Sequence, residues 1–269
     1  MRADIFVKNL YFPDSHDVVG YKGQKFRSCS PPSFMRFPVS RVGTMLRSLF
    51  LTCLILSVFI PSLSAPTQLA SGQELVFEDR FEGALKPGWE WLHDNAPCRR
   101  FVNNSLEILT EPFLSGEARN ALVRPINFLL GTNGYANAVY RIETECYFLE
   151  KPTARDQQCG IYWIQNNKVI FRLFFANDNG KMYVYPGKVP VETPGGRLRL
   201  NITGRFVVAE FCPLNEKTFR RLYEGKINWT SNDRISLQCW GGQKSGATDE
   251  NSQEQWARFR YFRVEKLDE

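Results

Sequence analysis

Short runs in which apolar and polar residues alternate dominate the chain beyond about residue 70. In residues 197–203, Leu198, Leu200 and Ile202 fall on one face and polar residues fall on the other. This period of two is typical of an antiparallel strand that is buried on one side. Comparable runs cover residues 75–81, 105–109, 138–148, 159–164, 169–175, 181–185, 206–211, 234–240 and 256–264.

The residues between these runs favour tight turns. Asn166-Asn167, NDNG at 177–180, PGG at 194–196 and Gly241-Gly242 supply residues that tolerate a positive φ, which hairpin turns require. Long helical periodicity is absent, and only short segments such as residues 214–221 are compatible with a turn of helix. Strands that recur about every 8–12 residues indicate a sandwich or a barrel. We therefore expect a single all-β domain.

The N-terminal part of the chain has the features of a leader sequence. An apolar run at residues 49–60 (LFLTCLILSVFI) has the length of a signal-peptide core and is too short to span a bilayer comfortably. Met45 and Arg47 precede it, and the small residues at 62–64 suit cleavage near Ser64 or Ala65. This arrangement predicts an exported protein.

Three segments follow from this interpretation. Residues 1–44 are an upstream extension, which we interpret as a mis-assigned start because translation from Met45 or Met35 would place the apolar run correctly. Residues 45–65 are the signal peptide, and residues 66–269 are the β-sandwich domain. The protein is expected to be secreted, periplasmic or on the cell surface, without a stable membrane span.

The positive charge of the chain lies mostly in the leader. The formal net charge is +6, from 34 basic and 28 acidic side chains. Residues 1–65 carry eight of the basic and three of the acidic side chains, so the predicted domain is close to neutral. It also has no run of lysine and arginine interleaved with aromatic residues. Binding to nucleic acid is therefore not expected.

Five cysteines remain after the predicted cleavage, which is an odd number. Export permits disulfides. Because the number is odd, at least one thiol would stay free or pair between two chains. Cys146 with Cys159 is the first candidate bridge, because these residues flank a predicted turn. Cys212 with Cys239 is the second, and buried free thiols are the alternative. His93 is the one histidine of the predicted domain, which argues against a zinc site of the usual ligand set.

Six short motifs, taken in order, resemble a known family. They are FEDRF at 77–81, WEWLH at 89–93, SLEI at 105–108, ARNAL at 118–122, QQCGI at 157–161 and ARFRYF at 257–262. Together they resemble the concanavalin A-like (laminin G-like) accessory domain at the C-terminus of many family-43 β-xylosidases and arabinofuranosidases, and the related DUF1349 domain. The order and spacing of the motifs carry the resemblance, which covers nearly the whole predicted domain.

The resemblance implies a two-sheet antiparallel β-sandwich of the jelly-roll kind, with a concave face and a carbohydrate-associated accessory role. Arg260 stands where the family's last strand often has an aspartate that helps to hold a structural calcium. Arginine offers no oxygen ligand, so no cofactor is expected. Glu78 and Asp79 remain as weak calcium candidates.

Glu143 and Glu145 are weak catalytic candidates. Their spacing places both carboxylates on one face of a strand, and glycoside hydrolases use two carboxylates across the scissile bond. The glucanase pattern needs a third acid closer to the first than Glu150 is. A solvated strand face is the simpler interpretation of the pair.

Sugar binding requires aromatic rings for the apolar face of a pyranose and planar polar groups for its hydroxyls. The candidate residues for such a site are Trp163, Gln165, Arg172, Tyr183 and Tyr185. The alternation of residues 181–185 predicts that Tyr183 and Tyr185 share one face. The alternative is that these aromatic rings pack in the core, and it applies most strongly to Trp240, next to Cys239.

The sequence supports three functional hypotheses. The first is an exported, non-catalytic, lectin-like module that binds a glycan or polysaccharide. The second is a divergent glycoside hydrolase or polysaccharide lyase on the same fold, which would use Glu143 and Glu145. The third is a structural or adhesive envelope protein, in which the odd cysteine joins two chains and the partner is a protein.

Overall fold

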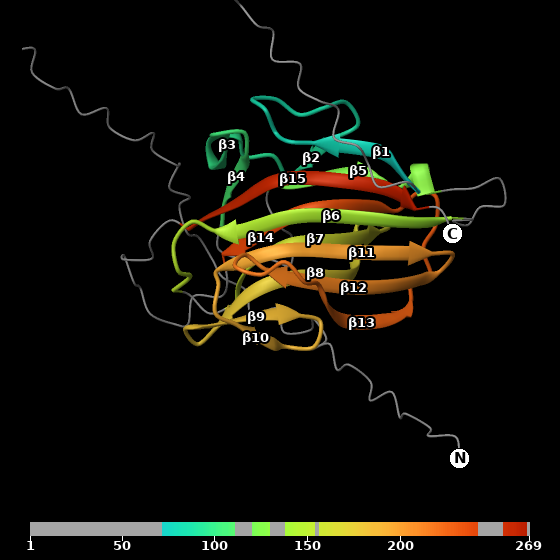
Figure 1. Cartoon of the computed structure of the whole chain (residues 1–269). Coiled ribbons are helices and arrows are strands. Elements are labelled where there is room, and N and C mark those ends of the chain that lie inside the picture. The colour runs from blue at the N-terminus through green and yellow to red at the C-terminus, as the bar shows by residue number, and fades with distance from the viewer. Residues whose placement is uncertain (1–71, 111–119, 130–137, 154–155, 242–254, 268–269) are drawn as a thin grey trace, which may run out of the picture. The chain divides into compact units, whose positions relative to one another are not determined.

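The structure is a computed structural model that describes residues 72–110, 120–129, 138–153, 156–241 and 255–267. In these ranges two antiparallel sheets pack face to face (Figure 1), and the helical elements are two 3-10 turns, η1 (Ala96–Cys98) and η2 (Asn127–Leu129). The predicted all-β, two-sheet sandwich is therefore confirmed. The predicted upstream extension (1–44) and signal peptide (45–65) lie outside the described residues.

The larger sheet, here called sheet A, has eight strands in the order β13-β12-β11-β6-β15-β4-β3, with β1 also paired to β15. Its strands are β1 (Gln73–Asp79), β3 (Arg99–Phe101), β4 (Leu106–Leu109), β6 (Val139–Phe148), β11 (Gly195–Thr203), β12 (Phe206–Pro213), β13 (Arg220–Lys226) and β15 (Trp256–Leu267). The first part of β15 pairs with β4 and the second part with β1. A register shift between Phe259 and Tyr261 separates the two parts, so Arg260 occupies a β-bulge.

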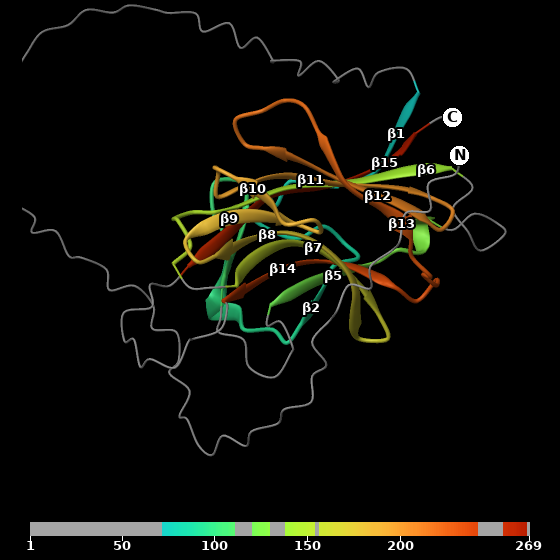
Figure 2. The same ribbon diagram turned by 90° about the horizontal axis from the view of Figure 1, so that it is seen from below.

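The smaller sheet, here called sheet B, has seven strands in the order β10-β9-β8-β7-β14-β5-β2. Its strands are β2 (Glu90–Leu92), β5 (Ala121–Pro125), β7 (Gln157–Gln165), β8 (Lys168–Asp178), β9 (Lys181–Tyr185), β10 (Val189–Val191) and β14 (Arg234–Gly241). Figure 2 shows that β7 and β8 bend, with the open side of the bend turned away from sheet A.

The hydrophobic core lies between the two sheets. Leu198, Leu200 and Ile202 of β11 are fully buried there, as the alternation of residues 197–203 predicts. Each such side chain contributes roughly 1.5–3 kcal/mol by leaving water. A slip of one residue would move all three to the outer face, so burial of this set also fixes the register of β11.

Two of the predicted hairpin turns have the expected backbone. Asn166 and Asn167 join β7 to β8 with φ values of 49° and 61°, and Asn179 and Gly180 join β8 to β9 with φ values of 54° and 80°. Residues with a small or hydrogen-bonding side chain tolerate this left-handed region, whereas a β-branched residue would be strained there. These tight turns therefore make β7, β8 and β9 direct neighbours in sheet B.

Residues 214–221 do not form the turn of helix with which their sequence is compatible. Residues 214–219 form turns and bends, and β13 begins at Arg220. The carbonyl oxygens of Glu216 and Lys217 accept hydrogen bonds from the guanidinium of Arg197 at 3.4 and 3.3 Å. These carbonyls are therefore paired without a helix. No helix in the described part of the chain is long and apolar enough to cross a membrane.

Candidate functional site

Four aromatic side chains line up across the outer face of sheet B, and we call them the aromatic row. They are Trp240 of β14, Tyr162 of β7, Phe174 of β8 and Tyr185 of β9, one from each of four neighbouring strands. Successive ring centroids lie 5.9, 6.0 and 4.9 Å apart, and successive ring planes differ by 4°, 17° and 6°. The row is thus an ordered layer of nearly parallel rings, of the kind that supports stacking interactions.

Gly160 makes room for the centre of the aromatic row. A Cβ added at this residue would lie 2.3 Å from the carbonyl oxygen of Leu173 and 2.6 Å from Cα of Phe174, so a larger residue would collide with β8. The hydroxyl of Tyr162 donates to Oε1 of Gln158 at 3.0 Å, so the phenol extends along β7 past the glycine. Burial raises the pKa of Tyr162 well above its usual value, which keeps this hydroxyl protonated as a donor.

Amide and hydroxyl groups lie beside the rings on β14. Nε1 of Trp240 donates to Oε1 of Gln238 at 3.0 Å, and Nε2 of Gln238 donates to Oγ of Ser236 at 2.9 Å. Residues two apart in a strand share a face, so these three side chains form one column on the outer side of sheet B. All three are buried. The column therefore holds the tryptophan ring in a fixed orientation.

Arg172 brings a positive charge to this face. It lies on β8 directly opposite Tyr162 of β7, and it is partly exposed. Its guanidinium carbon is 5.4 Å from the centroid of the Trp240 ring, which is within the range of a cation–π contact. The guanidinium therefore lies against the aromatic row.

The predicted alternation in β9 is present. Tyr183 and Tyr185 are half-buried on the outer face, and the two residues between and before them are more deeply buried. Nζ of Lys188 is 5.1 Å from the centroid of the Tyr183 ring and pairs with Asp178 at 2.6 Å. Burial raises the pKa of Tyr185. Arg172, Tyr183 and Tyr185 of the sequence-based candidate set therefore lie on one face of sheet B.

The other two candidates, Trp163 and Gln165, stand apart from this face, which corrects the predicted set. Trp163 is fully buried between the sheets, and its Nε1 donates to the carboxylate of Asp233 at 2.9 Å. Nε2 of Gln165 donates to the carbonyl of Asn228 at 2.8 Å and to the same carboxylate at 3.2 Å. The buried Asp233 thus fixes both side chains in a structural contact.

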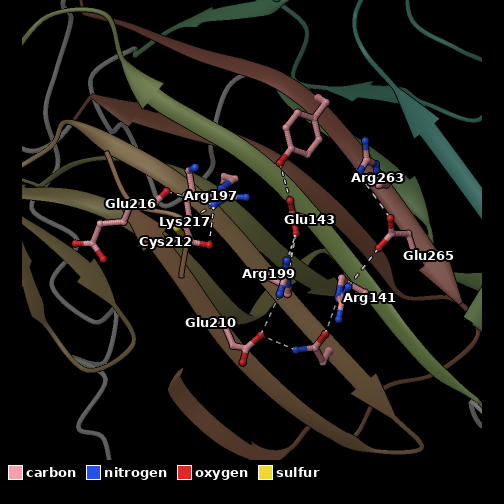
Figure 3. A network of polar contacts seen from close by, with 12 residues as sticks. Arg141, Glu143, Arg197, Arg199, Glu210, Cys212, Glu216, Lys217, Arg263 and Glu265 are labelled. Atoms are coloured by element: carbon pink, nitrogen blue, oxygen red, sulfur yellow. Dashed lines mark hydrogen bonds and ion pairs between the residues drawn. The ribbon is translucent and has the colours of Figure 1, made fainter. Parts of the chain in front are cut away.

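The outer face of sheet A is charged rather than aromatic, and Glu143 lies at its centre (Figure 3). The hydroxyl of Tyr261 donates to its Oε1 at 2.6 Å, and Arg199 approaches its Oε2 at 2.7 Å. Glu143 itself is buried. Burial, together with this carboxylate, raises the pKa of Tyr261 far above its usual value. Glu143 is therefore enclosed by two donors from two neighbouring strands.

The predicted spacing of Glu143 and Glu145 does place both on the outer face of β6, but each has a separate partner. Glu145 accepts from Arg260, in the β-bulge, at 3.1 Å. Further along the sheet, Glu265 lies 3.6 Å from both Arg141 and Arg263. The two candidate catalytic carboxylates are thus members of a ladder of ion pairs.

The calcium candidates Glu78 and Asp79 are likewise engaged by protein donors. Glu78 accepts from Arg263 at 2.6 Å and from Arg80 at 3.0 Å, and its pKa is lowered because these arginine contacts outweigh the opposing effect of burial. Asp79 is buried and accepts from the backbone of residues 81 and 86 at 2.8 and 2.9 Å, and from Trp89 at 3.0 Å. In the described ranges no group of three or more metal-ligating side chains is placed to hold a metal ion.

The predicted disulfides are not formed, since Cys146, Cys159, Cys212 and Cys239 are buried free thiols. Cys146 and Cys159 belong to different sheets, and the sulfur of Cys146 lies 3.9 Å from the carbonyl oxygen of Cys159. Burial raises the pKa of Cys146 well above the usual value of a thiol. Cys212 contacts the guanidinium of Arg197 on the outer face of sheet A, whereas Cys239 belongs to the core, so these two cannot pair.

The sequence prediction missed the centre of the aromatic row. Residues 157–164 are buried throughout, so both faces of β7 are apolar or neutral and no alternation tells which face is inward. Tyr162 and Trp163 are adjacent and therefore point to opposite faces. The available signal was Gly160, because a glycine within a strand marks a place where another group approaches closely.

Comparisons with known proteins support the fold. No protein-family model matches the chain, and no curated protein matches it significantly. Solved structures do match, among them the GH43 protein BlXynB from Bacillus licheniformis, with a TM-score of 0.51, 14% identity and 70% of this chain covered. A bifunctional GH43-CE protein from Bacteroides eggerthii gives a TM-score of 0.52, 16% identity and 71% coverage. A GH43B protein of a Bacteroides ovatus xyloglucan PUL gives 0.50, 14% and 77%.

These proteins are much longer than the matched region. The chain spans 38% of the B. licheniformis protein, 42% of the B. ovatus protein and 26% of the B. eggerthii protein. At such low identity the likeness concerns the fold alone. The described part of this chain is therefore a β-sandwich of the kind found as one part of these GH43 proteins.

Proposed function

We propose that this protein is a non-catalytic, lectin-like module that binds a glycan through the outer face of sheet B. The observation that carries the proposal is the aromatic row, with Arg172 and the amides of Gln158 and Gln238 beside it. Aromatic rings pack against the C–H face of a pyranose, and amide and guanidinium groups hydrogen-bond its hydroxyls. Both components occur together on this face, where Arg172, Phe174 and Tyr185 are half-buried and reachable by a ligand, whereas Tyr162 and Trp240 are buried beside them.

The fold likeness is consistent with a glycan-related role. The matched GH43 structures include a protein of a xyloglucan PUL, and in each the sandwich is a minor part of a larger chain. In our proposal the domain corresponds to the accessory domain that the sequence motifs resemble. The proposal also retains export, on the basis of the apolar run at residues 49–60.

The surroundings of Glu143 support a non-catalytic role. A nucleophile or general acid must be free to meet the substrate, and a general acid must carry a proton. Glu143 is buried, paired with Arg199 and bonded by Tyr261, and Glu145 is paired with Arg260. We therefore assign both carboxylates to holding sheet A together.

We also propose that glycan binding is independent of calcium. Glu78 and Asp79 already accept hydrogen bonds from protein groups, and Arg260 occupies the bulge where the resembled family often has an acidic residue. Binding that is unchanged by EDTA is the expected result. Loss of binding in EDTA that calcium restores would contradict this part of the proposal.

The test is binding of the purified protein to a panel of neutral and charged polysaccharides, followed by tryptophan fluorescence. Saturable binding that falls at least tenfold in Tyr185→Ala and Trp240→Ala is expected, because each removes a ring of the row. Phe206→Ala is the matched control, since Phe206 is an exposed aromatic residue on sheet A. Absence of binding to every polysaccharide, or equal losses in Phe206→Ala, would overturn the proposal.

A further inference from the structure

Arg172 differs from the other arginines of the two sheets in what its guanidinium contacts. On sheet A, the guanidinium groups of Arg141, Arg199, Arg258, Arg260 and Arg263 all pair with carboxylates. On sheet B, Arg124 donates to the carbonyl of Pro87 at 2.8 Å and Arg234 to the side-chain oxygen of Asn167 at 2.6 Å. Among the described residues, Arg172 has an aromatic ring as its contact and no hydrogen-bond acceptor.

In the part of the chain that the structure describes, no carboxylate pairs with Arg172. Asp178 is the acidic residue at the far end of the same strand, and Lys188 already neutralises it at 2.6 Å. The described residues that contact Arg172 or directly oppose it carry neutral rings, namely Trp240 and Tyr162. A guanidinium held against apolar rings is partly withdrawn from water, so an anion placed there gains more than one at a fully exposed arginine.

An arginine in this position suits a planar or tetrahedral anion. Its five N–H donors form a fixed fork that matches two oxygens of a carboxylate or a sulfate, and such pairs are stronger than neutral hydrogen bonds. The cation–π contact with Trp240 orients the guanidinium while leaving its N–H edges available. A ligand oxygen can therefore reach the fork while the sugar ring contacts the half-buried end of the row, at Phe174 and Tyr185.

We propose that the glycan bound by sheet B is anionic and that a carboxylate or sulfate on one of its sugars pairs with Arg172. This inference rests on the proposed glycan-binding function and names its substrate class. The carboxylate would belong to a uronic acid and the sulfate to a sulfated sugar. Both groups present at least two oxygens that share a negative charge. These oxygens belong to a planar group in the carboxylate and to a tetrahedral group in the sulfate.

The test compares matched pairs of polysaccharides that differ in charge alone. Polygalacturonate is compared with its carboxyl-reduced form, and dextran sulfate with dextran, by affinity electrophoresis of the intact protein. We expect one charged member to bind at least tenfold more tightly than its neutral partner, with affinity falling as salt rises from about 0.05 to 0.5 M. The pair that shows the difference identifies the anion as a carboxylate or a sulfate.

Variants assign the effect to Arg172. Arg172→Gln should remove the tenfold preference and leave binding to the neutral member within about twofold of the wild type. Arg172→Lys should keep part of the preference, because lysine retains the charge but lacks the fork. Arg221→Gln is the control, since it removes the same charge from an exposed ion pair on sheet A. A thermal-unfolding midpoint within a few degrees of the wild type shows that each variant is folded.

The outcomes separate this inference from the function on which it rests. Binding to neutral polysaccharides that depends on Trp240 and Tyr185, with no preference for a charged member, would refute the anionic ligand and retain the glycan-binding module. A preference that survives in Arg172→Gln, or that is lost equally in Arg221→Gln, would also refute the role of Arg172. No binding to any member would overturn both.

Discussion

The outer faces of the two sheets have the same strand geometry but carry different kinds of side chain. On sheet A, charged side chains from adjacent strands pair with one another, as Glu143 does with Arg199 (Figure 3). Glu145 pairs with Arg260 in the same way. On sheet B, the corresponding positions carry aromatic rings, amides and one arginine without an acceptor among the described residues. A face whose polar groups satisfy each other has little left for a ligand, whereas the described part of sheet B retains one guanidinium, that of Arg172, for which a ligand can supply the acceptor.

The ion pairs of sheet A also differ in how deeply they are buried. Glu107 is fully buried, and it pairs with Arg258 and Arg100, with the Arg100 contact at 2.6 Å. Exposed pairs such as Arg221 with Glu224 contribute about 0–1 kcal/mol, while removing one partner of a buried pair costs considerably more. The stabilising part of this face is therefore its buried pairs, such as those of Glu107 on β4 with Arg258 on β15 and Arg100 on β3.

Gly160→Val should lower the free energy of unfolding more than the other changes, because it disrupts sheet B beneath the aromatic row. The valine side chain would collide with the backbone of β8, so we expect a loss of about 3 kcal/mol or more in the free energy of unfolding. Urea unfolding measures the loss. Thr203→Val, at an exposed position of β11, is the control and should change stability by less than about 0.5 kcal/mol. Equal stability of the two variants would mean that the close approach of β7 and β8 is not required.

Glu143→Gln should have an intermediate effect and sharpen the contrast between the faces. It removes the ion pair with Arg199 but keeps an acceptor for Tyr261, so a loss of about 1–3 kcal/mol in the free energy of unfolding is expected. Glu145→Gln, two residues away, should cost less than about 1 kcal/mol because Arg260 is more than half exposed. Glycan binding should be unchanged in both variants. Weaker binding in Glu143→Gln would place ligand contacts on sheet A.

Raising the pH should have the smallest effect on the free energy of unfolding. It compares one tyrosine from the outer face of each sheet. Burial raises the pKa of Tyr261 and of Tyr162 above 10.0, the value expected in the unfolded chain. The unfolded state therefore loses these protons first, so stability is retained below pH 10 and falls above it by about 1 kcal/mol per pH unit for each tyrosine. Urea unfolding between pH 9 and 11 should show a smaller loss in Tyr261→Phe. An unchanged slope in that variant would contradict the raised pKa.

The sequence pattern predicts the long strands well but not the short ones. In β11 the alternation is complete, because one face meets the core and the other meets solvent. β2, β3 and β10 have three residues each, which is too short for a period to be recognised. β13 cannot be recognised for a different reason, since its residues are exposed or half-buried on both faces. Periodicity identifies a strand only where the environments of its two faces differ.

The candidate site could be predicted in part for the same reason. The alternation of β9 predicts that Tyr183 and Tyr185 share one face, and Arg172 lies on the neighbouring strand β8. The sequence does not distinguish Trp163 from Tyr162 as the outward residue, because neither face of β7 carries a polar pattern. The partners of Glu143 are 56 and 118 residues away in sequence, so they become visible only when the strands are placed side by side.

The position of β15 has a consequence for how the protein reaches its native state. The last strand lies between β6 on one side and β4 and β1 on the other, and Gln73 pairs with Leu267 (Figure 1). Sheet A therefore cannot close until almost the whole domain has been synthesised. Pairing between residues so distant in sequence slows folding, because the loop must close before the contacts form. We expect a chain that stays open during synthesis and then completes its larger sheet in one late, cooperative step.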